Sequence, residues 1–161
     1  MRPDRQLITW AGFSLVEFLV VIAVLAILAS LIVPNYLSQR NSTAEARVMS
    51  LMSAVRGGIS AYESRNGSFS GLPASGSGQT AYNSLRNALS QVLLLPSWAD
   101  AQRVFSPNQN TFSVTNSPGG ALSGHGYAAS VTSPVSSTRV IAATPYGVYV
   151  CSPGFSSCSP P

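Results

Sequence analysis

A lone carboxylate lies close to the start of a long apolar run near the N-terminus. Gly12 and Phe13 stand between a hydrophilic opening and an apolar run, and Glu17 follows four residues after Phe13. Cleavage after Gly12 would leave Phe13 with a free α-amine, a positive charge close to the carboxylate of Glu17. A lone carboxylate in an apolar environment costs about 3 kcal/mol or more, and no Arg, Lys or His lies between Phe13 and Val33. The partner of Glu17 is therefore absent, supplied by another molecule, or created by processing.

The other residues that could do chemistry do not form a catalytic set. His125 is the only histidine in the sequence, and its position between Gly124 and Gly126 indicates a loop residue. The carboxylates are scattered, and no glycine-rich phosphate loop follows a strand pattern. Cys151 and Cys158 are too far apart for a CxxC motif and lack further zinc ligands. The sequence predicts a protein that is not an enzyme and has no metal site or cofactor.

The apolar run from Phe13 to Val33 has the length of a membrane span. It contains twenty-one residues, and Glu17 is its only charged residue. A helix of this length spans roughly 30 Å, which matches the hydrocarbon core of a bilayer. The run is longer than the apolar core of a cleavable secretory signal, which has about 7–15 residues. The sequence thus predicts a transmembrane helix over residues 13–34.

Gly12, Phe13, Glu17 and Pro34, at these spacings around one apolar run, closely resemble the class III signal of type IV pilins and type II secretion pseudopilins. The resemblance implies that residues 1–12 are a prepilin leader and that a prepilin peptidase cleaves between Gly12 and Phe13. It also implies N-methylation of the new amine of Phe13. Glu17 would then help each subunit to join the filament.

The leader departs from the pattern of this family. Trp10 and Ala11 precede the glycine, where the family usually has Lys or Arg, and the basic residues lie further back at Arg2 and Arg5. The alternative is an uncleaved signal-anchor helix, in which Glu17 faces a cavity or stays protonated. Arginines on the two sides of the run are nearly balanced, so a cytoplasmic N-terminus follows from the cleavage motif and not from charge.

Pro34 interrupts the hydrogen bonding of the long helix. It lacks a backbone N–H, and its ring clashes with the carbonyl of Ser30. One interpretation is a simple kink near the exit from the membrane. The other follows from the resemblance, because the segment before such a proline can unwind in assembled filaments of the family. Here that segment lies roughly between Ala26 and Pro34, and Pro34 would be an assembly residue.

Residues 35–66 continue the helix with an amphipathic pattern. Five apolar side chains recur at steps of four and three and define one face: Val48, Met52, Val55, Ile59 and Tyr62. Gly57 and Gly58 weaken the helix by about 1 kcal/mol each, and Asn66-Gly67 is a typical helix end. The sequence predicts a single helix with an apolar half and an amphipathic half, which is also the architecture of the family.

Residues 67–161 are predicted to form a globular pilin head. Ser and Gly dominate residues 70–78, which indicates a loop, and a short helix capped by Thr80 should run to about Leu94. Four segments rich in Val, Thr, Tyr and Phe then have strand character: residues 111–115, 127–132, 139–144 and 147–151. The predicted fold class is α+β, with the long N-terminal helix of a type IV pilin packed on an antiparallel sheet of about four strands.

The resemblance also implies where the chain works. Before assembly it would be a single-pass protein of the inner membrane, and afterwards part of an extracellular or periplasmic filament. In the exported head a disulfide between Cys151 and Cys158 is expected, closing a short loop. The implied partners are other pilin subunits in a homo-oligomeric helical filament, prepilin peptidase and the pilus assembly machinery.

The predicted function is that of a structural subunit, the pilin of a type IV pilus or a related filament. The alternatives are a low-copy minor pilin that contacts DNA or a surface, a type II secretion pseudopilin, and the uncleaved signal anchor. The net charge of +4 is too weak and dispersed to indicate DNA binding. Cys151, Cys158 and the lack of an acidic cluster for a cation count against a pseudopilin. Motility, adhesion, DNA uptake and secretion all stay open as roles.

Overall fold

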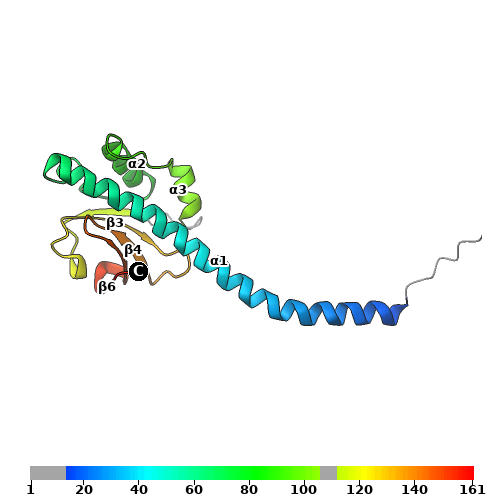
Figure 1. The fold of residues 1–161 in the computed structure, drawn as a ribbon. Helices are drawn as coiled ribbons and strands as arrows, with labels where there is room; N and C mark the ends of the chain where they lie inside the picture. Colours follow the sequence, from blue (N-terminus) through cyan, green and yellow to red (C-terminus); the bar gives the residue numbers. More distant parts are fainter. Residues whose placement is uncertain (1–13, 106–111) are drawn as a thin grey trace, which may run out of the picture. The chain divides into compact units, whose positions relative to one another are not determined.

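The computed structural model describes residues 14–105 and 112–161, and at residues 31–35 and 37–38 it describes the backbone alone. The chain divides into two compact units, Met1–Gln39 and Arg40–Pro161. We call Arg40–Pro161 the head unit. It contains the second part of a long helix, a six-stranded sheet and shorter helices (Figure 1).

Helix α1 runs from Leu15 to Asn66, a length of 52 residues. Its end is the predicted one, because Asn66 is the last helical residue and Gly67 takes a left-handed conformation with φ of 68°. The amide of Gly67 donates to the carbonyl of Glu63 at 2.7 Å, which satisfies a carbonyl that the helix end would leave free. The prediction of a single long N-terminal helix is confirmed.

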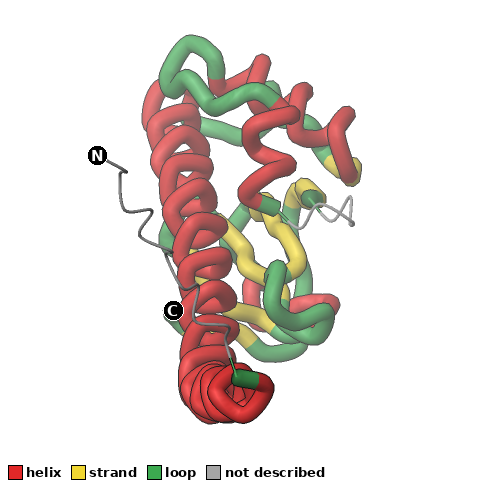
Figure 2. Tube along the Cα trace, turned by 90° about the vertical axis from the view of Figure 1, so that its right-hand side faces the viewer, coloured by secondary structure: helices red, strands yellow, loops and turns green. Residues whose placement is uncertain are grey.

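The predicted amphipathic face of α1 lies at the centre of the core. Four of its residues have an exposed fraction of 0%: Val48, Met52, Val55 and Ile59. The fifth, Tyr62, is partly buried against the same apolar cluster, which also contains side chains from the shorter helices and one face of the sheet. Figures 1 and 2 show this part of α1 lying along the sheet, so one helix face organises the head unit.

The sheet is an antiparallel meander in which every strand pairs with its neighbours in chain order. Its strands are β1 Ser75–Ser77, β2 Ser113–Asn116, β3 Tyr127–Thr132, β4 Val140–Ala143, β5 Val148–Cys151 and β6 Cys158–Ser159. The four predicted strands correspond to β2–β5. The bounds of β3 are the predicted ones, and those of the other three differ by at most two residues. The predicted α+β class with an antiparallel sheet is confirmed.

The sheet has six strands rather than the predicted four. The extra strands are its two edges, β1 in the segment predicted as a loop and β6 after the last predicted strand. All three residues of β1 are exposed. They pair with residues 113–115 of β2, with Gly76 opposite Val114 at the centre. Neither segment has an alternating apolar pattern. Both are strands because a neighbouring strand offers its backbone groups, which is a tertiary effect that no local signal reveals.

The first short helix differs from its prediction at both ends. Helix α2 is Gly78–Leu89, whereas a helix from a Thr80 cap to about Leu94 was expected. The amide of Leu93 donates to the carbonyl of Leu89 at 2.8 Å, and this turn ends the helix. After this turn, Leu93 packs against α1 close to Gly58.

Helix α3 (Trp98–Val104) lies in a segment for which no helix was predicted. Ser97 caps it, since its hydroxyl accepts from the amide of Asp100 at 3.3 Å and donates to the carboxylate of Asp100 at 2.6 Å. The Ser-x-x-Asp spacing is a capping signal that can be found in the sequence. The start of α3 is therefore visible in the sequence as a cap, although no helix was predicted from it.

Tyr82 of α2 joins the short helices through aromatic contacts. Its ring centroid lies 5.2 Å from that of Phe112, 5.5 Å from that of Trp98 and 6.1 Å from that of Phe105. Its hydroxyl donates to the carbonyl of Pro96 at 3.1 Å. Burial raises the pKa of the Tyr82 phenol to about 12, so the fold holds this side chain in its neutral form.

Gly57 and Gly58 are adjacent in α1 but have different surroundings. A methyl group at Gly58 would lie 3.0 Å from Cδ1 of Leu89 and 3.1 Å from Cδ2 of Leu93. At Gly57 no described atom would lie within 4 Å. The missing side chain at Gly58 therefore lets α2 and its following turn approach α1 closely, and the glycine pair does not break the helix.

These surroundings predict opposite consequences for two neighbouring substitutions. Gly57→Ala should raise the free energy of unfolding by about 0.5–1 kcal/mol, because alanine favours the helix and the site is open. Gly58→Ala gains the same propensity but must displace the buried Leu89, so it should be less stable than Gly57→Ala by about 1–3 kcal/mol. Urea unfolding of both variants measures the difference. Equal stability would contradict the proposed close approach.

Candidate functional site

The first turn of α1 contains Glu17. Ser14 precedes the helix, and its hydroxyl accepts from the amide of Val16 at 3.3 Å while its carbonyl accepts from the amide of Phe18 at 3.1 Å. Glu17 is exposed and is the acidic residue of this turn, where the helix dipole favours a carboxylate. Ser14 and Glu17 match the Ser-x-x-Glu capping pattern. The cap formed by Ser14 was missed from the sequence, although the pattern is visible there.

The predicted processing site and part of the predicted span lie outside the described residues. These are Gly12, Phe13 and the side chains of residues 31–35. Cleavage, N-methylation and the transmembrane helix over residues 13–34 therefore stay predictions. Within the ranges that the structure describes, we find no helix that is both long and apolar enough to cross a membrane.

The apolar side chains between Leu15 and Leu28 are exposed on all sides of the helix. Their exposed fractions run from 43% at Ile22 to 74% at Leu15. Apolar residues follow one another here without the 3.6-residue period that would leave one face for water. A helix that is apolar all round is stable only when it is covered, and the described residues leave this segment exposed.

The backbone of α1 stays helical through Ser30 and Pro34. Proline at position 34 leaves the carbonyl of Ser30 without its usual amide partner. The hydroxyl of Ser30 donates to the carbonyl of Ile27 at 2.7 Å. The single chain thus keeps its helix before Pro34, and the unwinding expected in assembled filaments stays a prediction.

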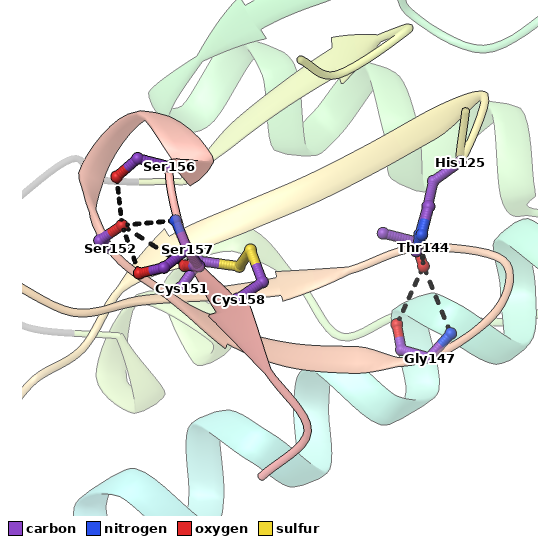
Figure 3. The surroundings of a disulfide bond; sticks show 8 residues. All are labelled: His125, Thr144, Gly147, Cys151, Ser152, Ser156, Ser157 and Cys158. Atoms are coloured by element: carbon purple, nitrogen blue, oxygen red, sulfur yellow. Dashed lines mark hydrogen bonds between the residues drawn. A yellow bond between two sulfur atoms is a disulfide. The ribbon is translucent and has the colours of Figure 1, made fainter. Parts of the chain in front are cut away.

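The expected disulfide between Cys151 and Cys158 is present (Figure 3). The two residues are also register partners between β5 and β6, so the covalent bond and the strand pairing support each other. Ser152 holds the intervening turn, because its hydroxyl accepts from the amide of Ser157 at 3.0 Å and bonds to the hydroxyl of Ser156 at 2.7 Å. The disulfide fixes a two-residue strand that has few other contacts to keep it in place.

The disulfide belongs to a small apolar cluster on the second face of the sheet. The buried members of this cluster are Leu122, Ala128, Ala142 and Cys151. Successive side chains in a strand point to opposite faces, and the neighbours of these alanines, Ala129 and Ala143, belong to the main core. The sheet therefore buries side chains on both faces, with a much smaller core on the face of the disulfide.

His125 lies in the loop before β3, as predicted. Its Nδ1 is 3.0 Å from Oγ1 of Thr144, and its ring meets those of Tyr146 and Tyr149 edge-on at centroid distances of 5.2 and 5.4 Å. The described part of the chain contains no group of three or more His, Cys, Asp or Glu side chains that could hold a metal ion. The contacts of His125 with Thr144, Tyr146 and Tyr149 place it beside the turn after β4.

The chain is similar to the type II secretion system core protein G of Klebsiella pneumoniae. The two sequences are 32% identical over 107 residues, which cover 62% of this chain and 76% of that protein. This chain belongs to the type IV pilin-like family. No family model matches the chain, and no solved structure matches it. The long N-terminal helix packed on an antiparallel sheet is consistent with the fold expected for this family.

Membership in the pilin-like family makes this chain a filament subunit and a structural protein rather than an enzyme. The similar protein is a pseudopilin. In the sequence, the two cysteines and the lack of an acidic cluster counted against a pseudopilin, but the similarity supports this alternative. Among the predicted site residues, the structure brings Cys151 and Cys158 together. Glu17 and Pro34 lie apart along the N-terminal part of α1.

Loss of the disulfide should destabilise the head unit. The chain-entropy estimate for so short a loop is about 2–3 kcal/mol, and β6 has only two pairs with β5, Val150↔Ser159 and Cys151↔Cys158. We expect the double variant Cys151→Ser, Cys158→Ser to unfold at lower urea concentration than the unsubstituted chain. A reductant should lower the stability of the unsubstituted chain to that of the variant and leave the variant unchanged. Stability that is insensitive to both changes would contradict this role.

Proposed function

We propose that this chain is a pseudopilin-type subunit that assembles into a filament through the N-terminal part of α1. The 32% identity to a type II secretion system core protein G carries this proposal. The exposed apolar side chains between Leu15 and Leu28 support it, because a filament core would cover them. The chain would reside in the inner membrane before assembly and in a periplasmic or extracellular filament afterwards.

On this proposal, assembly moves the apolar part of α1 from one apolar environment into another. Lipid would cover the helix before assembly, and the same helices of neighbouring copies would cover it afterwards. Because lipid is as apolar as these side chains, the exchange by itself contributes little, and close packing and polar contacts decide the association. Glu17 is the acidic residue of this region, so its pairing is the contact that can give the association its register.

Glu17 would pair with the amine of Phe13 on a neighbouring copy. Prepilin peptidase would first cut between Gly12 and Phe13 and methylate the new amine, and the pilus or secretion machinery would then extract the subunit from the membrane. A buried charge without a partner costs several kcal/mol. Registers that leave Glu17 unpaired would therefore be rejected.

The intact mass and N-terminal peptide of the protein from its native membranes test the processing. We expect a chain that begins at a methylated Phe13 and lacks two hydrogens because Cys151 and Cys158 are joined. A chain that still begins at Met1 would refute the processing and support the signal anchor.

Substitution of Glu17 tests the pairing. Glu17→Gln keeps a side chain that suits the capping pattern with Ser14 but removes the charge, and Glu17→Ala removes both. We expect both variants to be cleaved and inserted normally and to form no filaments in electron micrographs. Ser14→Ala is the matched control, because it removes the cap and keeps the charge, and it should still assemble. Normal filaments from Glu17→Gln would refute the pairing.

A pilus pilin is the second candidate, favoured by the disulfide between Cys151 and Cys158 and by the absence of a cation-binding cluster in the described residues. Deletion of the gene in its native organism separates the two candidates. Loss of secreted proteins from the medium with surface pili intact would identify the pseudopilin. Loss of surface pili with secretion intact would identify the pilus pilin.

A further inference from the structure

Two turns at opposite ends of β3 and β4 present large apolar side chains to solvent. The base turn, residues 133–139, joins β3 to β4 and presents Val135, which is 41% exposed. The tip turn, residues 144–147, joins β4 to β5 and presents Tyr146, which is 63% exposed. The strand β3 between these ends has six residues, which corresponds to roughly 20 Å. In the described part of the head unit, Leu94 is the one further exposed large apolar side chain.

We propose that these turns form a head-to-tail contact between copies of this chain, in which Tyr146 of one copy packs on Val135 of the next. This proposal rests on the filament function proposed above and names the surface by which neighbouring head units meet.

Hydrogen bonds hold the base turn in one conformation. The hydroxyl of Ser133 accepts from the amide of Val135 at 3.2 Å, and the amide of Ser133 donates to the carbonyl of Arg139 at 2.8 Å. Nη1 of Arg139 lies 3.1 Å from Oε1 of Glu45 on α1, which compensates the charge of the turn. A contact at Val135 would therefore require little ordering of the chain and would bury no unpaired charge.

The tip turn is held by the buried hydroxyl of Thr144 (Figure 3). This hydroxyl donates to the carbonyl of Gly147 at 3.3 Å and accepts from the amide of Gly147 at 3.3 Å. The same hydroxyl is hydrogen-bonded to Nδ1 of His125 at 3.0 Å, which holds the imidazole in place. The fixed imidazole in turn supports the rings of Tyr146 and Tyr149 edge-on. Tyr146 is thus an exposed aromatic side chain on a rigid support.

The occupant that fits both turns is a second copy of the chain. The base turn lies beside Glu45 of α1, and the start of β3 lies beside Phe69, three residues after α1 ends, where Phe69 stacks on Tyr127 at 5.9 Å. The two turns therefore follow one another along the direction of α1. In a filament of parallel subunits, the tip of one copy faces the base of the next, and such a heterologous contact propagates without closing. A rigid tyrosine against an aliphatic side chain is also a typical anchor of a protein interface.

Cysteine cross-linking in assembled filaments tests the contact. The sequence contains only the two cysteines that form the native disulfide, so introduced thiols are distinct. Oxidation of the double variant Val135→Cys, Tyr146→Cys should give a ladder of dimers and longer oligomers, because each copy would link to two neighbours. Either single variant should give no cross-linked dimer. The pair Leu94→Cys, Tyr146→Cys is the matched control with the same number of exposed thiols, and it should also give none.

Filaments of the Val135→Cys, Tyr146→Cys chain that yield no ladder, or an equal ladder from the control pair, would overturn the contact. Dimers from Val135→Cys alone would overturn its head-to-tail direction. The peptide that joins positions 135 and 146, identified by mass spectrometry, confirms that the native disulfide has not exchanged.

Serine substitutions give a second measurement that does not depend on cross-linking. Tyr146→Ser and Val135→Ser should each lower the yield of sheared filaments by roughly tenfold, whereas Leu94→Ser should keep the yield of the unsubstituted chain. Equal yields from all three variants would overturn the contact. Absence of filaments from the unsubstituted chain would remove the proposed function and the contact with it, whereas filaments without a ladder would remove the contact alone.

Discussion

The packing of one face of α1 is the interaction on which the rest of the head unit depends. Val48, Met52, Val55 and Ile59 are fully buried, and they share their cluster with the short helices and with one face of the sheet. Complete burial of such side chains contributes about 1.5–3 kcal/mol each. Without this face, the main apolar side of the sheet would lose its cover. The closeness of the packing leaves little room for a side chain at Gly58, whereas Gly57, one residue away, lies in open space.

The same helix meets a different constraint in its first part. Between Leu15 and Leu28 the exposed fractions of the large apolar side chains stay above 40%, because no other described residue covers them. One continuous helix thus has a segment that packs within the head unit and a segment that the described residues leave uncovered. Assembly into a filament, as proposed, would cover that segment, and Glu17 adds a charge to it.

The edges of the sheet show how the fold compensates for a small core. The second face carries only a few buried side chains around Leu122 and Cys151, too few to hold a two-residue strand by burial alone. The disulfide and the serine hydrogen bonds around Ser152 supply the missing constraint. The turns at the two ends of β4 are likewise held by polar contacts, through Ser133 at one end and Thr144 at the other. Polar contacts therefore order the segments that the apolar core does not reach.

The local patterns of the chain determined the long helix, its buried face, its end at Asn66, the four central strands and the pairing of Cys151 with Cys158. Each of these depends on residue type and spacing within one segment, and the family resemblance depends on four residues around one apolar run. Tertiary structure alone decided the edge strands β1 and β6, the early end of α2 and the different surroundings of Gly57 and Gly58. These features arise from backbone groups and side chains that are distant in sequence, so no local pattern encodes them. Tertiary structure also placed Val135 and Tyr146 at opposite ends of one sheet, because only the antiparallel pairing of β3, β4 and β5 sets the direction of each turn.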